Sequence, residues 1–350
     1  MSERVLIFDY NACLRSEYAK NGCDICVDLC PEKAMVFDRN LLRLDAERCT
    51  DCGACAGSCP SEAFGHEALD LPALVDRLAR QKEPALMCGE GLPCLAVFSS
   101  EALAALALKR DKDVALRLGG CFSCALNREG KVLPAIEEAV AEANRFLAFA
   151  GFSVRVRVDK SANEAEPKEV SRRDLFKGLI AKRLAKSEPS VSPVNEQKRI
   201  PPRRLFLQQA LKERAEQLAQ TKGRTDFSFV TGKYIDSGLC DNCRECAMFC
   251  PTGALTLTSG NDGIIFQVGK CIHCGICNDV CRPRAIGDSD GFDMVTFAFD
   301  RAEVLVRHRL EICEECKVAF PYKGGEKLCG RCRDFKANFS DLFTLAKDMA

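Results

Sequence analysis

The sequence predicts an α+β multidomain protein made of several small cysteine-rich units. Three observations lead to this expectation. The chain has 350 residues with 47% hydrophobic and 29% charged content, which is enough for two or three globular cores. It contains 24 cysteines but 3 histidines and no tryptophan, far above average cysteine usage. These cysteines fall into groups with regular spacing, so cysteine chemistry dominates the prediction.

Pairs of cysteines two residues apart indicate bound metal rather than disulfides in this chain. Residues 1–10 do not combine a charged start with the apolar core of an export signal. No apolar run reaches the roughly 20 residues of a membrane span. We therefore expect a cytoplasmic protein, in which thiols stay reduced and free to bind metal.

The most specific pattern occurs twice within residues 231–300, where each copy reads C-x2-C-x2-C-x3-C. A loop with thiolates at every third position wraps three corners of an iron–sulfur cube, and the fourth cysteine reaches the neighbouring cluster. This exchange predicts two [4Fe-4S] clusters. One set of ligands is Cys240, Cys243, Cys246 and Cys281, and the other is Cys271, Cys274, Cys277 and Cys250.

Residues 1–70 carry the same unit with one departure. One run is complete, whereas Lys20 stands where the other should begin. Cys13 is the candidate for the missing corner, with nine residues between the first and second ligands, a length that a surface loop can absorb. The predicted ligand sets are Cys13, Cys23, Cys26 and Cys59 for one [4Fe-4S] cluster, and Cys49, Cys52, Cys55 and Cys30 for the other.

Both regions resemble bacterial two-cluster ferredoxin domains. The resemblance rests on the four cysteine runs and on the short hairpins expected between them, at 34–44 and 254–268. It covers about 130 residues and implies two pseudo-symmetric [4Fe-4S] clusters in each domain, hence four in the chain.

Residues 71–158 have an α/β pattern with a further group of cysteines. Strand ends at one edge of an open sheet would bring together Cys88, Cys94, Cys121 and Cys124. Paired thiolates suit a [2Fe-2S] cluster, a further [4Fe-4S] cluster or zinc, and buried thiols without metal are the alternative. The arrangement resembles the small iron–sulfur subunit of methyl-viologen-type hydrogenases and the thioredoxin-like ferredoxins, although its spacing departs from both. The expected elements are strands at 85–87, 114–118 and 153–158, and helices at 95–108 and 134–149.

Residues 301–350 end in two C-x2-C pairs separated by twelve residues, which is the spacing of a zinc ribbon. A strand at 304–306 leads into the first pair. We expect a structural zinc ion, with an iron–sulfur cluster as the alternative. The predicted ligands are Cys313, Cys316, Cys329 and Cys332.

Residues 159–230 separate the two halves and read as a basic linker with helices. Between 171 and 224 there are 14 Lys or Arg against 5 Asp or Glu, and Pro201 and Pro202 punctuate the segment. An apolar stripe flanked by basic residues occupies 175–184. This segment could dock an acidic partner subunit, rest on a membrane surface as a peripheral contact, or fold onto its own protein.

The motifs favour an electron carrier over an enzyme. The chain has no G-x-G-x-x-G, no P-loop and no C-x3-C-x2-C loop. We therefore expect an electron-transfer subunit of a larger oxidoreductase, and we expect no nucleic-acid partner. The resemblance implies partners such as hydrogenase, formate dehydrogenase or heterodisulfide-reductase-like subunits. The alternative is a regulatory or assembly protein whose clusters sense oxygen or iron.

Overall fold

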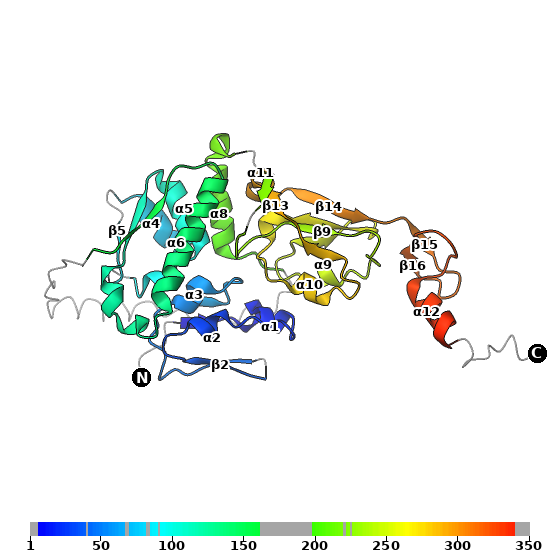
Figure 1. The fold of residues 1–350 in the computed structure, drawn as a ribbon, viewed down its shortest axis with the longest axis horizontal. Helices are drawn as coiled ribbons and strands as arrows, with labels where there is room; N and C mark the ends of the chain where they lie inside the picture. The colour runs from blue at the N-terminus through cyan, green and yellow to red at the C-terminus, as the bar shows by residue number, and fades with distance from the viewer. Residues whose placement is uncertain are drawn as a thin grey trace, which may run out of the picture.

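The computed structural model describes residues 6–39, 41–66, 70–81, 85–89, 92–161, 198–219, 222–224 and 226–339. The molecule is elongated, and its last unit lies at one end of the long axis (Figure 1). Within the described residues, no helix combines the length and the apolar character needed to cross a membrane.

The first ferredoxin-like unit, residues 6–66, consists of two small antiparallel sheets joined by short helices. Strand β1 pairs with β4, and β2 pairs with β3, so the hairpin expected at 34–44 is confirmed. The elements are β1 (Leu6–Phe8), η1 (Tyr10–Ala12), α1 (Leu14–Glu17), α2 (Ile25–Leu29), β2 (Met35–Asp38), β3 (Leu41–Leu44), α3 (Ala54–Ser58) and β4 (Phe64–His66).

The second ferredoxin-like unit, residues 233–288, repeats this topology. Its first strand pairs with its last, β9 with β12, and the expected hairpin at 254–268 is formed by β10 and β11. The elements are β9 (Lys233–Ile235), α9 (Glu245–Met248), β10 (Leu255–Leu257), β11 (Gly263–Gln267), η6 (Val268–Lys270), α10 (Ile276–Val280) and β12 (Ile286–Asp288).

Three later elements extend the second unit. Strand β14 (Ala302–Arg307) pairs with β11, so the strand expected at 304–306 belongs to this sheet. Strand β13 (Gly291–Asp293) pairs with β8 (Lys222–Arg224), and helix α11 (Met294–Ala298) follows it.

The middle unit is a parallel sheet of three strands in the order β5, β6, β7. Its elements are α4 (Leu71–Ala79), β5 (Ala85–Leu86), η2 (Leu95–Val97), α5 (Ser100–Arg110), β6 (Val114–Arg117), η3 (Gly119–Ser123), η4 (Ala125–Asn127), α6 (Val132–Phe149) and β7 (Val156–Asp159). The expectation of one helix from Leu95 to Leu108 is wrong. Ser99 caps α5 by accepting a hydrogen bond from the Ala102 amide, so the helix begins after it.

Helix α8 (Pro202–Lys212) is part of the hydrophobic core. Leu207 and Leu211 are fully buried among residues of the middle unit and the second ferredoxin-like unit. Pro202 starts this helix rather than marking a linker, because proline is favoured at a first helical position. The 3-10 turn η5 (Ala215–Gln217) follows. Residues 162–197, which include the apolar stripe at 175–184, lie outside the described residues.

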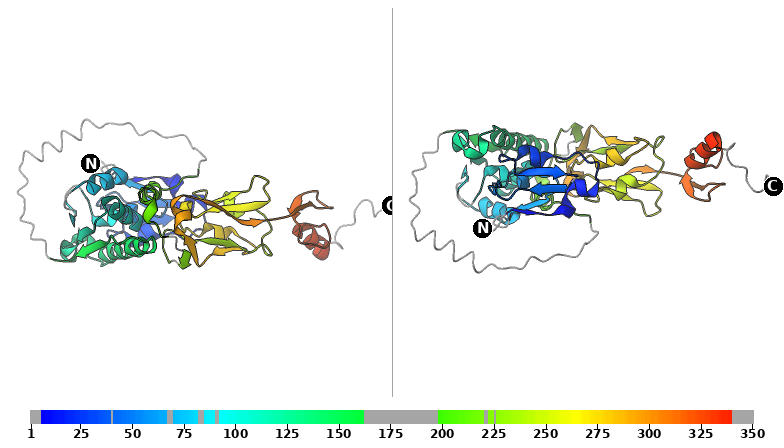
Figure 2. Two further views of the ribbon diagram at one scale, coloured as in Figure 1. Left: turned by 90° about the horizontal axis from the view of Figure 1, so that it is seen from above. Right: turned by 90° about the horizontal axis from the view of Figure 1, so that it is seen from below.

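The terminal unit, residues 308–339, is a hairpin followed by a helix. Strand β15 (Leu310–Ile312) pairs with β16 (Ala319–Pro321), and α12 (Gly330–Phe339) follows. Both views of Figure 2 place this unit beyond the second ferredoxin-like unit, at the opposite end from the middle unit.

Candidate iron–sulfur and metal centres

The three complete cysteine runs share one backbone conformation. The residue before the second cysteine has a positive φ in each run, at Asp51, Asn242 and His273. The residue after that cysteine does too, at Gly53, Arg244 and Gly275. One left-handed residue on each side of the second cysteine makes the loop curve tightly, so the thiols of the loop face a common centre. Asp, Asn and His tolerate this conformation better than other side chains.

The four runs also end alike. Three residues after each fourth cysteine the backbone is again left-handed, at Lys33, Glu62, Gly253 and Arg284. An alanine follows in all four cases. In three of them its amide donates to the sulfur of that fourth cysteine, over 3.2 to 3.3 Å. Such N–H···S bonds stabilise a thiolate ligand, because they favour the charged sulfur.

Two groups of thiols form in the first ferredoxin-like unit. Burial first, and then the charges of Cys59, Cys23 and Cys13, raise the pKa of Cys26 to about 12. We call these four residues site A. Site B consists of Cys30, Cys49, Cys52 and Cys55, which line a shared cavity of about 20 Å³.

The second ferredoxin-like unit has two equivalent groups. Site D comprises Cys240, Cys243, Cys246 and Cys281, around a cavity of about 20 Å³. Site E comprises Cys250, Cys271, Cys274 and Cys277, around a cavity of about 20 Å³. In all four sites three cysteines come from one run and the fourth from the partner run, which is the arrangement that ligand exchange requires.

The middle unit gathers its own four cysteines, named site C, beside the ends of β5 and β6. Burial is the main reason that the pKa of Cys94 rises to about 12, and the charges of Cys52, Cys88 and Cys121 raise it further. A hydrogen bond from the Ala96 amide opposes this rise. Cys121 in turn interacts with Cys88 and Cys124. Cys52, whose charge acts on Cys94, belongs to site B. Sites B and C are therefore neighbours.

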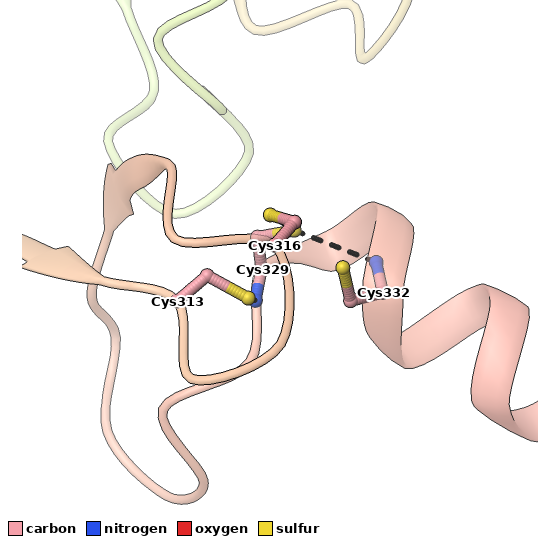
Figure 3. A group of neighbouring side chains, drawn as sticks. All are labelled: Cys313, Cys316, Cys329 and Cys332. Carbon is pink, nitrogen blue, oxygen red and sulfur yellow. Dashed lines mark hydrogen bonds between the residues drawn. The ribbon is translucent and has the colours of Figure 1, made fainter. Parts of the chain in front are cut away.

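Site F, in the terminal unit, is much tighter than the others. The sulfurs of Cys313, Cys316, Cys329 and Cys332 all lie within 4.8 Å of one another (Figure 3). Those of Cys316 and Cys329 are 3.7 Å apart. Four sulfurs at about 2.3 Å from a tetrahedral zinc ion are separated by about 3.8 Å. The Cys329 amide donates to the sulfur of Cys313, and this bond is the main reason that the pKa of Cys313 falls to about 6.

The donor sets fit two kinds of metal group. Over the described residues, no second set of three potential ligand atoms gathers within 4.8 Å, so the thiols of sites A to E stand too far apart to share one ion. Wider spacing around a cavity suits a cluster of several irons. Burial raises the pKa of several thiols at these sites, to about 12 for Cys246 and Cys274, so a bound cationic group is needed to hold those two as thiolates.

Several residues beside these sites were not anticipated from the sequence. The ammonium group of Lys233 is buried at site E and pairs with Asp288. Burial lowers its pKa, but the charges of Cys277, Cys271 and Asp288 outweigh burial and raise that pKa overall. His273, inside the cysteine loop of site E, has its Nδ1 2.9 Å from the carbonyl oxygen of Phe227.

A buried ion-pair triad on α8 and α5 was also missed. Glu101 binds both Arg203 and Arg204, at 3.1 and 2.5 Å, and all three side chains are buried. A lone glutamate in the apolar stretch 95–108 was the available signal, because an acid at a buried position needs a cationic partner.

Comparison with known proteins defines the class of the two repeated units. A family model described as a 4Fe-4S dicluster domain matches residues 21–63. A second model with the same description matches residues 232–282. The chain therefore contains two ferredoxin-type 4Fe-4S dicluster domains and is an iron–sulfur protein of the electron-transfer type. The first match begins after Cys13, so that residue lies outside it.

One curated relative is similar to part of the chain. The ferredoxin-type protein NapH of Haemophilus influenzae is 36% identical over 70 residues, which is 19% of this chain and 24% of the relative. The chain thus spans about a quarter of the length of this relative.

Proposed function

We propose that this protein relays electrons as a subunit or partner of a larger cytoplasmic oxidoreductase. Sites A, B, D and E would each hold a [4Fe-4S] cluster, which supplies one-electron chemistry when bound. The observation that carries the proposal is that four groups of cysteines, each completed by its partner run, lie in one folded body with a fifth group beside them. A protein with a single redox task would need only one such group of cysteines.

We assign a fifth iron–sulfur cluster to site C. No three of its thiols lie within 4.8 Å of one another, which disfavours zinc, whereas both a [2Fe-2S] and a [4Fe-4S] cluster separate at least two of their ligands more widely. Replacing Cys121 and Cys124 together should remove a spectroscopic signal distinct from those of sites A, B, D and E. Loss of zinc instead, with all redox signals retained, would overturn this assignment.

We assign zinc to site F on its close tetrahedral spacing. A closed site of four thiolates leaves no coordination position for a substrate, so this ion would be structural. Metal analysis of the purified chain should give one zinc per molecule, and an additional iron signal in place of zinc would contradict the assignment.

The partner is proposed to be another redox subunit, such as those of hydrogenase, formate dehydrogenase or heterodisulfide-reductase-like enzymes. The sequence has no nucleotide-binding motif. A redox enzyme would therefore have to bind at each end of the relay to supply or accept the electrons. The basic residues of 171–186 lie outside the described residues, and their charge would steer an acidic partner toward the chain.

Copurification from native cells tests this proposal. Neutralising Arg172, Arg173, Lys182 and Arg183 should weaken recovery of the partner in a salt-dependent manner and leave iron content unchanged. The matched control neutralises four exposed basic residues elsewhere, Arg39, Arg80, Arg117 and Arg282. If the native chain runs alone and exchanges electrons with several unrelated enzymes, it is a free carrier and not a dedicated subunit.

A further inference from the structure

The nine residues between Cys13 and Cys23, which interrupt the repeat, lie against the second ferredoxin-like unit. Leu14, the first residue of α1, is 3% exposed and packs in a small apolar cluster with Ile272, Ile276 and Val280. These three residues belong to the cysteine loop and helix α10 of site E. The insertion therefore contacts the other domain at the loop that holds its metal ligands.

Two further contacts fix the same position. The ring of Tyr18 meets that of Phe249 edge to face, with centroids 5.7 Å apart, and Phe249 precedes Cys250 of site E. The side chain of Asn21 bridges the two sites. Its Oδ1 accepts from the Cys23 amide at 3.1 Å, and its Nδ2 donates to the Cys274 carbonyl at 3.3 Å. A ligand residue of site A is thus joined to one of site E through one amide group.

The buried triad makes a second bridge between the same two sites. Arg203 donates to the carbonyl of Cys59, a site A residue. Arg204 donates to the carbonyl of Cys271, a site E residue, at 2.6 Å. Glu101 pairs with both guanidinium groups. The triad therefore holds the backbone beside one ligand of each site.

The remaining neighbours place five sites in one row. Site C lies beside site B, where η2 packs on α3; site B lies beside site A, where α3 packs on α2; and site E lies beside site D, where α10 packs on α9. The two cysteines that are exposed, among all 24, are Cys88 of site C and Cys243 of site D. These are the two ends of the row, where an outside partner would need access.

We propose that electrons cross between the two ferredoxin domains at one place, from site A to site E, and that the Cys13–Cys23 insertion exists to close this junction. The inference rests on the proposed function, and the row would run C, B, A, E, D. In the crossing step one cluster loses an electron and the other gains it, in either direction, with no proton or further reactant. The insertion is then a connecting device rather than a tolerated loop.

Paired ligand variants of the full-length holoprotein test the junction by EPR spectroscopy of the reduced clusters. A chain with Cys49→Ala and Cys240→Ala keeps sites A and E, and it should show spin–spin splitting between them. The converse chain, with Cys13→Ala and Cys274→Ala, keeps sites B and D. Site B should still couple to site C beside it, whereas the signal of site D should be that of an isolated cluster. A split site D signal in the converse chain, with no splitting between sites A and E in the first, would overturn the proposal.

A second measurement leaves all cysteines in place, in case the ligand variants fold poorly. The double variant Tyr18→Ala and Asn21→Ala should lower the microwave power at which the site A and site E signals saturate, because relaxation through the neighbouring cluster is weakened. Asn11→Ala, an exposed neutral change just before Cys13, should leave saturation unchanged. Equal saturation in all three proteins with full iron content would overturn the junction. Missing iron or irreversible reduction in the unaltered protein would instead count against the proposed function.

Discussion

The two ferredoxin domains share a backbone but differ wherever they meet the rest of the molecule. Both pair their first strand with their last and carry left-handed residues at matching positions. At the position of Leu6 in the first domain, seven residues before the first ligand, the second has Lys233. Where the first has Gly57, two residues after the third cysteine of its second run, the second has Asp279, which is exposed.

This comparison separates two kinds of constraint. The features common to both domains serve metal ligation, since each concerns where a thiol points or what bonds to its sulfur. The positions that differ are set by what each domain contacts at that point. Gly57 faces the middle unit, Asp279 faces solvent, and the insertion after Cys13 faces the second domain.

The largest effect is expected at Cys13, which tests whether the insertion preserves the fourth ligand of site A. Cys13→Ala should remove one cluster, a loss of about four irons per chain, because the remaining three thiols leave one corner without a protein ligand. Iron and sulfide analysis measures this loss. Cys88→Ala is the control and should spare sites A, B, D and E. An unchanged cluster content in Cys13→Ala would mean that the insertion does not supply the corner.

Site F contrasts with the wider sites, and its loss should affect folding rather than electron transfer. Cys329→Ser should release zinc and unfold the terminal unit, since structural zinc contributes about 10 kcal/mol to folding in comparable small units. Zinc content and limited proteolysis of residues 308–339 measure the effect, while the redox spectra should stay unchanged. Altered cluster signals in this variant would show that site F takes part in the relay.

Gly57 sharpens the comparison at the middle unit. A Cβ built on it would lie 2.1 Å from the Ala96 carbonyl oxygen and 2.7 Å from the Val97 carbonyl carbon, so α3 must move away from η2. Gly57→Ala should destabilise the protein by about 1 to 3 kcal/mol, the usual range for overpacking, as measured by chemical denaturation. Gly65→Ala, whose Cβ would make an ordinary 3.8 Å contact with Ile7, should cost far less. Similar losses for both would contradict the close approach.

Lys233 should produce the smallest and most specific difference. A reduced cluster carries one more negative charge, which a buried cation stabilises, so Lys233→Leu should lower the reduction potential of site E toward that of site B. The expected shift is roughly 50 to 100 mV, from about 1 to 2 kcal/mol of charge interaction. A redox titration followed by EPR measures it. Lys109→Leu, a largely buried lysine on α5 paired with Asp76, is the control, and an equal shift there would remove the assignment to Lys233.

Much of the fold followed from cysteine spacing, because a cluster dictates where its loops must run. The two hairpins and the parallel strands of the middle unit were also predictable, since short apolar runs between turn signals have few other uses. The start of α5 was missed because its apolar residues continue past Ser99 without a break in pattern. Only the capping bond of Ser99 marks the boundary.

The interactions between units were the part that the sequence could not show. Arg203 and Arg204 follow two prolines in a basic stretch, and their burial depends on Glu101, about a hundred residues earlier. The role of Asn21 depends in the same way on Cys274, which is 253 residues away. Contacts at such separation leave no local periodicity, so a single sequence gives no means of pairing them.

Iron and acid-labile sulfide analysis of anaerobically isolated chain, joined to a reversible redox titration, tests the central claim most directly. The relay predicts at least about 16 irons per chain, four for each of sites A, B, D and E, more if site C is filled, and rapid reversible reduction of several clusters. A fully metallated chain with about 8 irons, or one labile cluster that is lost on exposure to oxygen while the others do not accept electrons, would contradict it and favour a sensor.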